Sequence, residues 1–554
     1  MLRPLPPRVA AAALLAVLLV AGLWPYHDVL GWLPWGSDAV KWVGRGDPAN
    51  PGWAQWVFGS KHFVGYRPVT ALSFTLNDVL GGASPFVFRS TDLLAFLASG
   101  AALFAAHRKL SGDRSALALV PVLLVFAHPT TEEIVPFAAR RSYTLAATFG
   151  LGAVVLLVDA GRSWVRAGLG ALALTLAVLS NEVAYVLVPL VPWFVSRTAA
   201  DLRRVVAGSA PALVGVAVAI ALRWWVLGTL GGYNRRFFAF VRKGVPVWIE
   251  LKVWKPDDIL AAAWSHTVDP ISVVGAPALF HGALETGFGI AAAVWIAWIG
   301  LVRPAIRRGP ETQLRWALSA WIVGALAIVV LSQTWFWRQA HGVLVPLSML
   351  LALELRAVAA ELRAPRPWRV APAVLALALL GAAALWNGPL VRGLHRQPHQ
   401  NAIEGTPIAL RVRQLLEPVG EGSMIYLAVP LRANAGHLVR KWADQFGYEK
   451  RVECHLLAHT TFNGAYEGSR VRVDREPLRL HLSQGMTMAT VPGMPENPGP
   501  EGFDVTRLWR ATRPTWLFAV DTRDAWGVRV PAPPPGVEPL PDPGEAAEQD
   551  DLDD

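Results

Sequence analysis

The stretch "FAHPTTEEIVPFAARRSY", residues 126–143, places two glutamates and two arginines between two apolar runs. The apolar runs lie near residues 115–127 and 143–158, and both have the composition of membrane-spanning helices. The charged stretch is therefore predicted to be a short turn between two spans. This pattern favours a polytopic membrane protein and raises the question of what the four charges do there.

The composition supports the same fold class. Hydrophobic residues make up 53% of the 554 residues and charged residues only 17%, and the mean hydropathy is +0.36. We expect about eleven membrane spans in a mainly α-helical bundle. They lie near residues 9–25, 91–106, 115–127, 143–158, 165–180, 183–195, 205–227, 285–302, 314–332, 342–355 and 370–386.

The positions of the cations predict the orientation, because Lys and Arg collect in short cytoplasmic connections. Every second connection is basic, from Arg3 and Arg8 to the arginines between 356 and 369. The N-terminus is therefore expected inside and the C-terminus outside. The segments expected outside are 24–90, the turns at 128–133, 180–182 and 333–341, the loop 228–284 and everything after 387. We interpret the first apolar stretch as a retained anchor, because no clear signal-peptidase site follows it.

Net charge and cysteine content exclude other classes. The net charge of +10 is largely explained by the cytoplasmic loops, so anionic lipid headgroups rather than nucleic acid are the expected partner. The single cysteine, Cys454, excludes an intramolecular disulfide and is expected to be a packed thiol.

The chain is predicted to have three parts. Residues 1–390 form the transmembrane module, with 24–90 as its first external loop. Residues 391–530 form an extracytoplasmic β-rich (α+β) domain, because "SMIYLAVP", "RVECHLLAH", "SRVRVD", "LRLHLS" and "TWLFAV" have the short, β-branched or alternating character of strands. Residues 531–554 are rich in proline and then acidic, and are expected to be disordered.

Carboxylates at the outer face are the first candidate site residues. Asp38 lies in a tryptophan-rich loop that is expected at headgroup depth. Glu132 and Glu133 end the third span, and Glu182 follows Asn181 in a tight outer turn. The alternatives are that Asp38 is an ordinary loop residue, that Glu132 and Glu133 lie in a solvated turn, and that Asn181 is required by the backbone geometry of its turn.

Arginines in short external turns oppose the positive-inside bias, so Arg140, Arg141 and Arg338 suggest a bound anion. A guanidinium group suits phosphate oxygens in a bidentate geometry. Arg67 lies in a long loop, which is exempt from the bias, and outer-leaflet headgroups are the alternative partner of all these cations. His128 and His341 could bind a divalent metal ion with Glu133 or Asp38, but no ligand spacing supports this, and hydrogen-bonded histidines at helix ends are favoured.

The order of the motifs gives a resemblance. Residues 66–94 begin with "YRP", residues 123–149 contain "HPTTEE" and "ARRSY", and residues 172–190 contain "LSNE". This order resembles the N-terminal membrane core of the GT-C class of glycosyltransferases, which includes protein O-mannosyltransferases and bacterial lipid- or glycan-modifying transferases. Residues 337–347, "WRQAHGVLVPL", are weakly similar to a late element of that class. The external domain is not covered.

The resemblance implies roles for individual residues. Asp38 would be the general base, Glu133 and Glu182 further carboxylates, Arg141 and Arg338 phosphate contacts, with Arg67 as another donor-binding residue. His128, Glu132 and His341 would support the site. The sequence departs from the class at Ser37, at Tyr143 and at Asn181, which leaves the metal and the donor open.

We therefore expect an integral-membrane glycosyltransferase that moves a sugar from a polyprenyl-phosphate donor to a protein, lipid or glycan hydroxyl. An inverting transfer needs a base on one face of the anomeric carbon and cations on the leaving phosphate. The site and the C-terminal domain are expected on the exterior face of a bacterial inner membrane. A lipid-linked sugar transporter and an inactive membrane anchor for an external binding domain are the alternatives.

Overall fold

The computed structural model of the 554-residue chain describes residues 4–31, 42, 46, 48–49, 52–59, 65–81, 84–128, 131, 134–135, 137–228, 311–332, 341–361, 412–432, 452–460, 471–482, 486–488, 501–520 and 525–539. The chain divides into two compact units, one of residues 1–31 and 45–399 and the other of residues 32–44 and 400–554.

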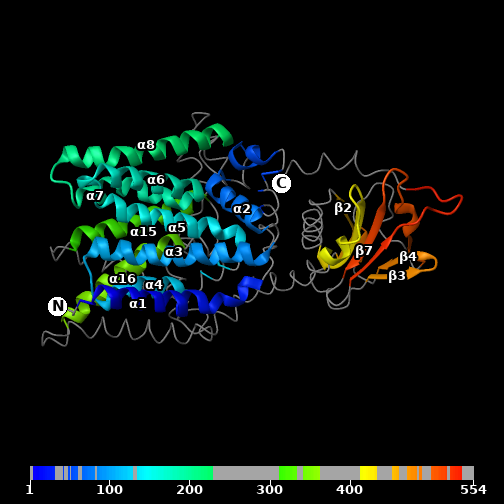
Figure 1. Ribbon diagram of the computed structural model, residues 1–554, viewed down its shortest axis with the longest axis horizontal. Coiled ribbons are helices and arrows are strands. Elements are labelled where there is room, and N and C mark those ends of the chain that lie inside the picture. Colours follow the sequence, from blue (N-terminus) through cyan, green and yellow to red (C-terminus); the bar gives the residue numbers. More distant parts are fainter. Residues whose placement is uncertain are drawn as a thin grey trace. The chain divides into compact units, whose positions relative to one another are not determined.

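The first unit is a bundle of helices (Figure 1). Its longer elements are α1 (Pro7–Val17), α2 (Pro68–Gly81), α3 (Pro85–Ser111), α4 (Val120–Ala127), α5 (Arg141–Leu157), α6 (Trp164–Ser180), α8 (Leu202–Leu227), α15 (Thr312–Ser332) and α16 (His341–Glu361). Shorter elements are η1 (Leu18–Leu23), η2 (Trp24–Gly31), η4 (Gln55–Gly59), η5 (Ala116–Leu119), η7 (Ala138–Arg140), η8 (Ala160–Arg162), η9 (Glu182–Leu190) and α7 (Val191–Ser196).

The helices have the length and composition of membrane spans. In the described part of the chain, five are long and apolar enough to cross a membrane, and three shorter apolar helices accompany them. Helices occupy nine of the eleven predicted stretches, and the other two, 285–302 and 370–386, lie outside the described residues. The prediction of a mainly helical membrane protein is confirmed, whereas the span number and the orientation stay predictions.

Local sequence signals set where the helices begin and end. Proline occupies the first turn of α3 and α4, where its missing N–H costs no hydrogen bond. The side chains of Ser163 and Asp201 cap the starts of α6 and α8. Gly112 and Gly228 follow α3 and α8 with φ of 66°, a left-handed conformation that favours glycine.

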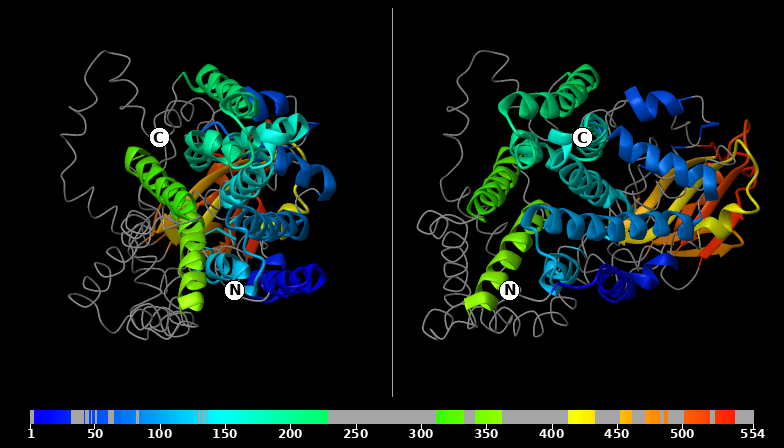
Figure 2. Two further views of the ribbon diagram at one scale, coloured as in Figure 1. Left: turned by 90° about the vertical axis from the view of Figure 1, so that its left-hand side faces the viewer. Right: turned by 60° about the vertical axis from the view of Figure 1, so that its left-hand side comes forward.

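Helices α5 and α6 are antiparallel, because Asn181 after the end of α6 is hydrogen-bonded to Ser142 at the start of α5. The bundle therefore has two ends. We call the end that holds the start of α5 and the end of α6 the Glu182 end, and the opposite end the Asp159 end. Helices α3, α5, α6 and α8 pack in that order. Helices α15 and α16 lie side by side along one flank of the bundle (Figure 2).

The second unit contains two small sheets. The larger has the order β5-β2-β1-β7-β8 and consists of β1 (Met424–Arg432), β2 (Glu453–Thr460), β5 (Met486–Met488), β7 (Thr515–Val520) and β8 (Ala525–Arg529). β1 is parallel to both β2 and β7, whereas the edge strands β5 and β8 are antiparallel. The smaller sheet is antiparallel with the order β3-β4-β6, formed by β3 (Val471–Arg475), β4 (Leu478–Leu482) and β6 (Phe503–Asp504).

All five predicted strand stretches form strands, so the prediction of a C-terminal β region is confirmed. The core of this unit combines residues of both sheets, including Tyr426, Leu457, Leu480 and Leu517. Cys454 is buried in β2, as expected for a packed thiol. Most of the acidic tail lies outside the described residues.

Candidate functional site

Glu182 is shared by two arginines at the Glu182 end of the bundle. Its Oε2 accepts hydrogen bonds from Arg67 Nη2 at 2.8 Å and from Arg67 Nε at 3.1 Å. Its Oε1 accepts one from Arg223 Nη2 at 2.5 Å. Arg67 directly precedes α2, Glu182 begins η9 and Arg223 lies near the end of α8, so the carboxylate joins three helices. We call these three residues the Arg67–Glu182–Arg223 cluster.

The cluster carries a net positive charge and is partly exposed. It contains two guanidinium groups and one carboxylate, and the side chains of Arg67 and Glu182 are 16% and 23% exposed. Arg223 is buried, with 2% of its side chain exposed. Burial raises the pKa of the neighbouring Tyr66 hydroxyl above its ordinary value. A net positive, partly exposed group of this kind attracts an anion such as phosphate.

Backbone geometry fixes the position of Glu182. Asn181 is extended, and its side chain caps η9 by accepting a hydrogen bond from the Val183 N–H. Its amide also donates to Ser142 Oγ of α5 at 3.0 Å, and Thr70 of α2 donates to the Ser180 carbonyl at 3.1 Å. The Asn of the "SNE" turn therefore serves both the backbone and the packing of neighbouring helices.

Arg141 is enclosed by protein acceptors. Its Nε donates to Asp92 Oδ1 at 2.6 Å, its Nη1 to Asn77 Oδ1 at 2.5 Å and its Nη2 to the Phe88 carbonyl at 3.0 Å. The guanidinium group also lies over the Phe74 ring at 4.3 Å, and the residue is 1% exposed. Arg141 would have to leave these partners to bind a phosphate. In this structure it is a buried side chain that links α2, α3 and α5 through hydrogen bonds.

His128 lies in a hydrogen-bonded turn at the same end. It is buried, and its carbonyl accepts a hydrogen bond from Thr131 Oγ1 at 2.7 Å. Thr131 Oγ1 is also 2.7 Å from the hydroxyl of Tyr26 in η2. The "HPTT" motif is thereby tied to η2, at the start of the segment predicted as the first external loop.

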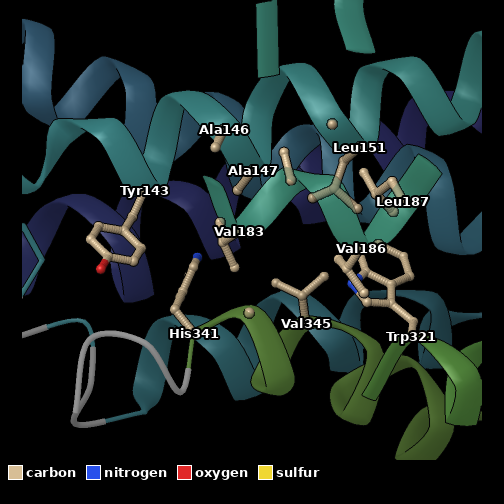
Figure 3. A pocket seen from close by; sticks show the side chains of 13 residues that line it. Tyr143, Ala146, Ala147, Leu151, Val183, Val186, Leu187, Trp321, His341 and Val345 are labelled. Atoms are coloured by element: carbon tan, nitrogen blue, oxygen red, sulfur yellow. The ribbon is translucent and has the colours of Figure 1, made fainter. Parts of the chain in front are cut away.

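A pocket opens between α5, η9, α15 and α16 (Figure 3). It holds about 390 Å³ of empty space including its open mouth. Tyr143 and His341 lie at one end and Leu187 and Trp321 at the other, with small and aliphatic residues between them. His341 is 3% exposed, and neither of its ring nitrogens has a hydrogen-bond partner among the described residues.

Four predicted site residues, Asp38, Glu132, Glu133 and Arg338, lie outside the described residues. Of the predicted residues that the structure describes, it brings Arg67 and Glu182 into contact. No group of three metal-binding side chains forms among the described residues. Asp38 and Glu133, which the sequence suggests as metal ligands with His128 or His341, are not in that set.

Sequence reasoning missed Arg223, Asp92 and Asn77. Two signals were available, because ionisable residues within spans are costly and usually paired. Arg223 is a single cation in the apolar run of α8, and Asp92 is the single carboxylate of α3. Asn77 gave no signal of its own. Helix α2, which carries Asn77 and follows Arg67, was also missed, because it lies in a stretch read as external loop.

Comparison with known proteins gives structural similarity only. No protein-family model and no curated protein matches the sequence. The chain is similar in structure to GT-C glycosyltransferases. For ArnT from Cupriavidus metallidurans bound to undecaprenyl phosphate, the identity is 13%, 93% of each chain is covered and the TM-score is 0.45.

The chain is also similar in structure to an Archaeoglobus fulgidus oligosaccharyltransferase tethered to an acceptor peptide. Its identity is 13%, its TM-score is 0.42, and the match covers 79% of this chain. The chain spans 63% of the length of that oligosaccharyltransferase. At these identities and scores, the similarity assigns no residue of this chain a role.

Proposed function

We propose that this chain is an integral-membrane glycosyltransferase that moves a sugar from a polyprenyl-phosphate donor to an acceptor hydroxyl. The observation that carries the proposal is the convergence of the sequence motifs at the Glu182 end. Arg67 of "YRP" pairs with Glu182 of "SNE", Asn181 bonds Ser142 of "RRSY", and "HPTT" is tied to Tyr26. Motifs that are more than 100 residues apart in the chain thus share one end of the bundle.

The chemistry of this end suits sugar transfer from a phosphate. The departing phosphate carries negative charge, and the Arg67–Glu182–Arg223 cluster supplies two guanidinium groups for it. Both oxygens of Glu182 already bind guanidinium groups. We therefore assign Glu182 to holding the arginines and not to accepting the proton of the acceptor hydroxyl.

The base is proposed to be Asp38, with Glu133 as the second candidate. Both residues belong to segments that the sequence expects at the same face as the cluster. Arg338 also belongs to a segment expected at this face, and we propose it as a further phosphate contact. The lipid tail of the donor would remain in the bilayer while its phosphate reaches the cluster at headgroup depth.

The test is a transfer assay in membrane vesicles with radiolabelled polyprenyl-phosphate sugars. Asp38→Asn should lower the rate by about 10² to 10⁴-fold, because it removes the base while keeping the side-chain size. Arg67→Ala and Arg223→Ala should weaken donor binding by about 10-fold or more, because each removes a charge-assisted contact. Arg166→Ala is the matched control, since Arg166 pairs with Asp159 at the opposite end.

Two results would contradict the proposal. The first is a normal rate of sugar transfer by each of the variants Asp38→Asn, Glu133→Gln and Glu182→Gln, because none of these carboxylates would then be needed for the reaction. Movement of the intact lipid-linked sugar across the membrane without transfer would indicate a transporter. Mass spectrometry of envelope glycans and lipid-linked sugars in a strain that lacks the gene identifies the sugar and the acceptor.

A further inference from the structure

Three cations gather around one carboxylate at the Asp159 end of the bundle. Asp159 Oδ2 accepts a hydrogen bond from Lys109 Nζ of α3 at 2.8 Å and another from Arg166 Nη1 of α6. Arg162 lies in η8 between α5 and α6, and its positive charge acts on that of Lys109. The group therefore contains three positive charges and one negative charge. We call these four residues the Asp159 cluster.

The turn between α5 and α6 holds the cluster in place. The Asp159 carbonyl accepts a hydrogen bond from the Arg162 N–H at 3.0 Å, and the Ser163 side chain caps α6 by accepting one from the Arg166 N–H. The Asp159 side chain is only 9% exposed, whereas those of Lys109 and Arg166 are 37% and 52% exposed. The surplus positive charge therefore lies at the surface, in an ordered arrangement that a diffuse basic loop lacks.

An apolar surface begins directly beside the cluster. Val165, Leu169 and Leu172 are exposed, and their spacing of four and three residues places them on one side of α6. Arg166 precedes Leu169 by three residues, so this cation lies at the edge of the same side. Trp164, the first residue of α6, is 85% exposed, and tryptophan is enriched where lipid headgroups meet hydrocarbon. The helix thus offers positive charge at its start and apolar contacts farther along.

Both features fit an anionic phospholipid. An ammonium group has three donor hydrogens and a guanidinium group has five, so the bonds to Asp159 leave donors for phosphate oxygens. The chains of the lipid would cover the exposed apolar side chains, whereas a soluble phosphate would use the cations alone. The Asp159 end is also the end that the charge pattern predicts in the cytoplasm, where the facing leaflet carries anionic lipids.

We propose that the Asp159 cluster binds the phosphate of an anionic phospholipid whose chains lie along Val165, Leu169 and Leu172 of α6. The cations of the cluster come from α3, η8 and α6, so the bound headgroup joins these three elements. The site is at the opposite end of the bundle from the Arg67–Glu182–Arg223 cluster and does not depend on the proposed sugar transfer.

Native mass spectrometry of the full chain in detergent micelles tests the proposal, with phosphatidylglycerol and phosphatidylcholine titrated separately and no sugar donor present. Lys109→Gln, Arg162→Gln and Arg166→Gln each remove one positive charge, whereas Arg166→Lys keeps it. Arg204→Gln is the matched control. Arg204 is also an exposed cation near the exposed Leu202 at the start of α8, but it pairs with Asp201, the cap of its own helix.

We expect each loss of charge in the cluster to weaken binding of phosphatidylglycerol by about 5-fold, the contribution of one cation near a membrane surface. Arg166→Lys should keep most of the affinity, because attraction to the headgroup depends mainly on charge. Arg204→Gln should bind phosphatidylglycerol as the wild type does. Phosphatidylcholine, whose headgroup carries its own cation, should bind the wild type more weakly.

Equal binding of phosphatidylglycerol by the wild type and the three Gln variants of the cluster would overturn the proposal. An equal loss of binding in Arg204→Gln would also overturn it, because attraction to the whole basic end would then explain the result. The wild type gives a second measurement that needs no variant to fold. Phosphatidylglycerol should raise its melting temperature more than phosphatidylcholine does, because the bound lipid joins α3 to α6. Equal shifts from both lipids would contradict the site.

Discussion

Arg141 shows how one side chain can organise the end of a bundle. Its three donor nitrogens connect α5 to Asp92 and the Phe88 carbonyl of α3 and to Asn77 of α2, so it holds the helix that follows Arg67. Arg141→Ala should lower the free energy of unfolding by about 3–5 kcal/mol, because Asp92 loses its closer guanidinium partner while buried. Thermal unfolding in detergent, followed by fluorescence-detected size-exclusion chromatography, measures this.

Arg140→Ala is the control, because Arg140 is adjacent in the chain and only partly buried. A stable Arg141→Ala protein that no longer binds polyprenyl phosphate would instead support the predicted role of Arg141 as a phosphate contact. Arg141→Lys should be intermediate in stability, since a point charge cannot keep the forked hydrogen bonds.

Gly65 lies against the carboxylate of Glu182. A Cβ atom at this position would come closer to Glu182 Oε1 than van der Waals contact allows, and would lie 3.2 Å from Arg67 Nε. Gly65→Ala should therefore displace the Arg67–Glu182 pair and lower sugar transfer by about 10-fold without unfolding the protein, the size expected for a disturbed charge-assisted contact. Gly152→Ala in α5 is the matched control, because a Cβ atom there meets no atom within 4 Å. Equal transfer rates for both variants would show that the pair does not act in the reaction.

At the scale of elements, the start of β2 is joined to the segment before β7 across the central strand β1. Glu453 binds His455 Nε2 at 2.6 Å and also Arg513. Burial raises the pKa of the Glu453 carboxyl, but the hydrogen bonds from His455 and Arg513 outweigh it and hold this pKa below its ordinary value of 4.5. A carboxyl with a depressed pKa stabilises the fold fully above its unfolded value, and this contribution is lost as the pH falls through the folded value.

Hydrogen exchange of the full chain, corrected for intrinsic rates, should therefore show protection of β1 and β2 falling from about pH 5 to about pH 3. In Glu453→Gln, protection should be lower at neutral pH and should depend less on acid over the same range. Identical acid profiles for the variant and the wild type would assign the loss to another group.

At the scale of the whole molecule, the charge pattern predicts an orientation. Reporter fusions at Ser111, Ala199 and Arg308 should report the cytoplasm, because the cations around them resist translocation. Fusions at Gly59, Asn181 and Gly420 should report the exterior. Ser111 is at the Asp159 end of α3 and Asn181 at the Glu182 end of α6, so these two positions form a matched pair. An interior signal at Asn181 would place the Arg67–Glu182–Arg223 cluster on the wrong face for the proposed reaction.

Apolar runs and alternation were sufficient to predict most elements of both units, since they report burial one segment at a time. Pairings between segments were not predictable in this way. Nothing in "YRP" or in the apolar run of α8 indicates that Arg67 and Arg223 share one carboxylate. Likewise, the strand patterns of β1, β2 and β7 do not reveal that the three are parallel neighbours.

The sharing of Glu182 also has a consequence for biosynthesis. Its two partners are 156 residues apart, one before α2 and the other near the end of α8. As the ribosome delivers the chain from its N-terminus, Arg67 can meet Glu182 as soon as η9 has emerged, but Arg223 arrives only with the last turns of α8. The complete cluster is therefore a late event of membrane insertion, and a nascent chain arrested before α8 would carry the motifs without the second guanidinium group that completes them.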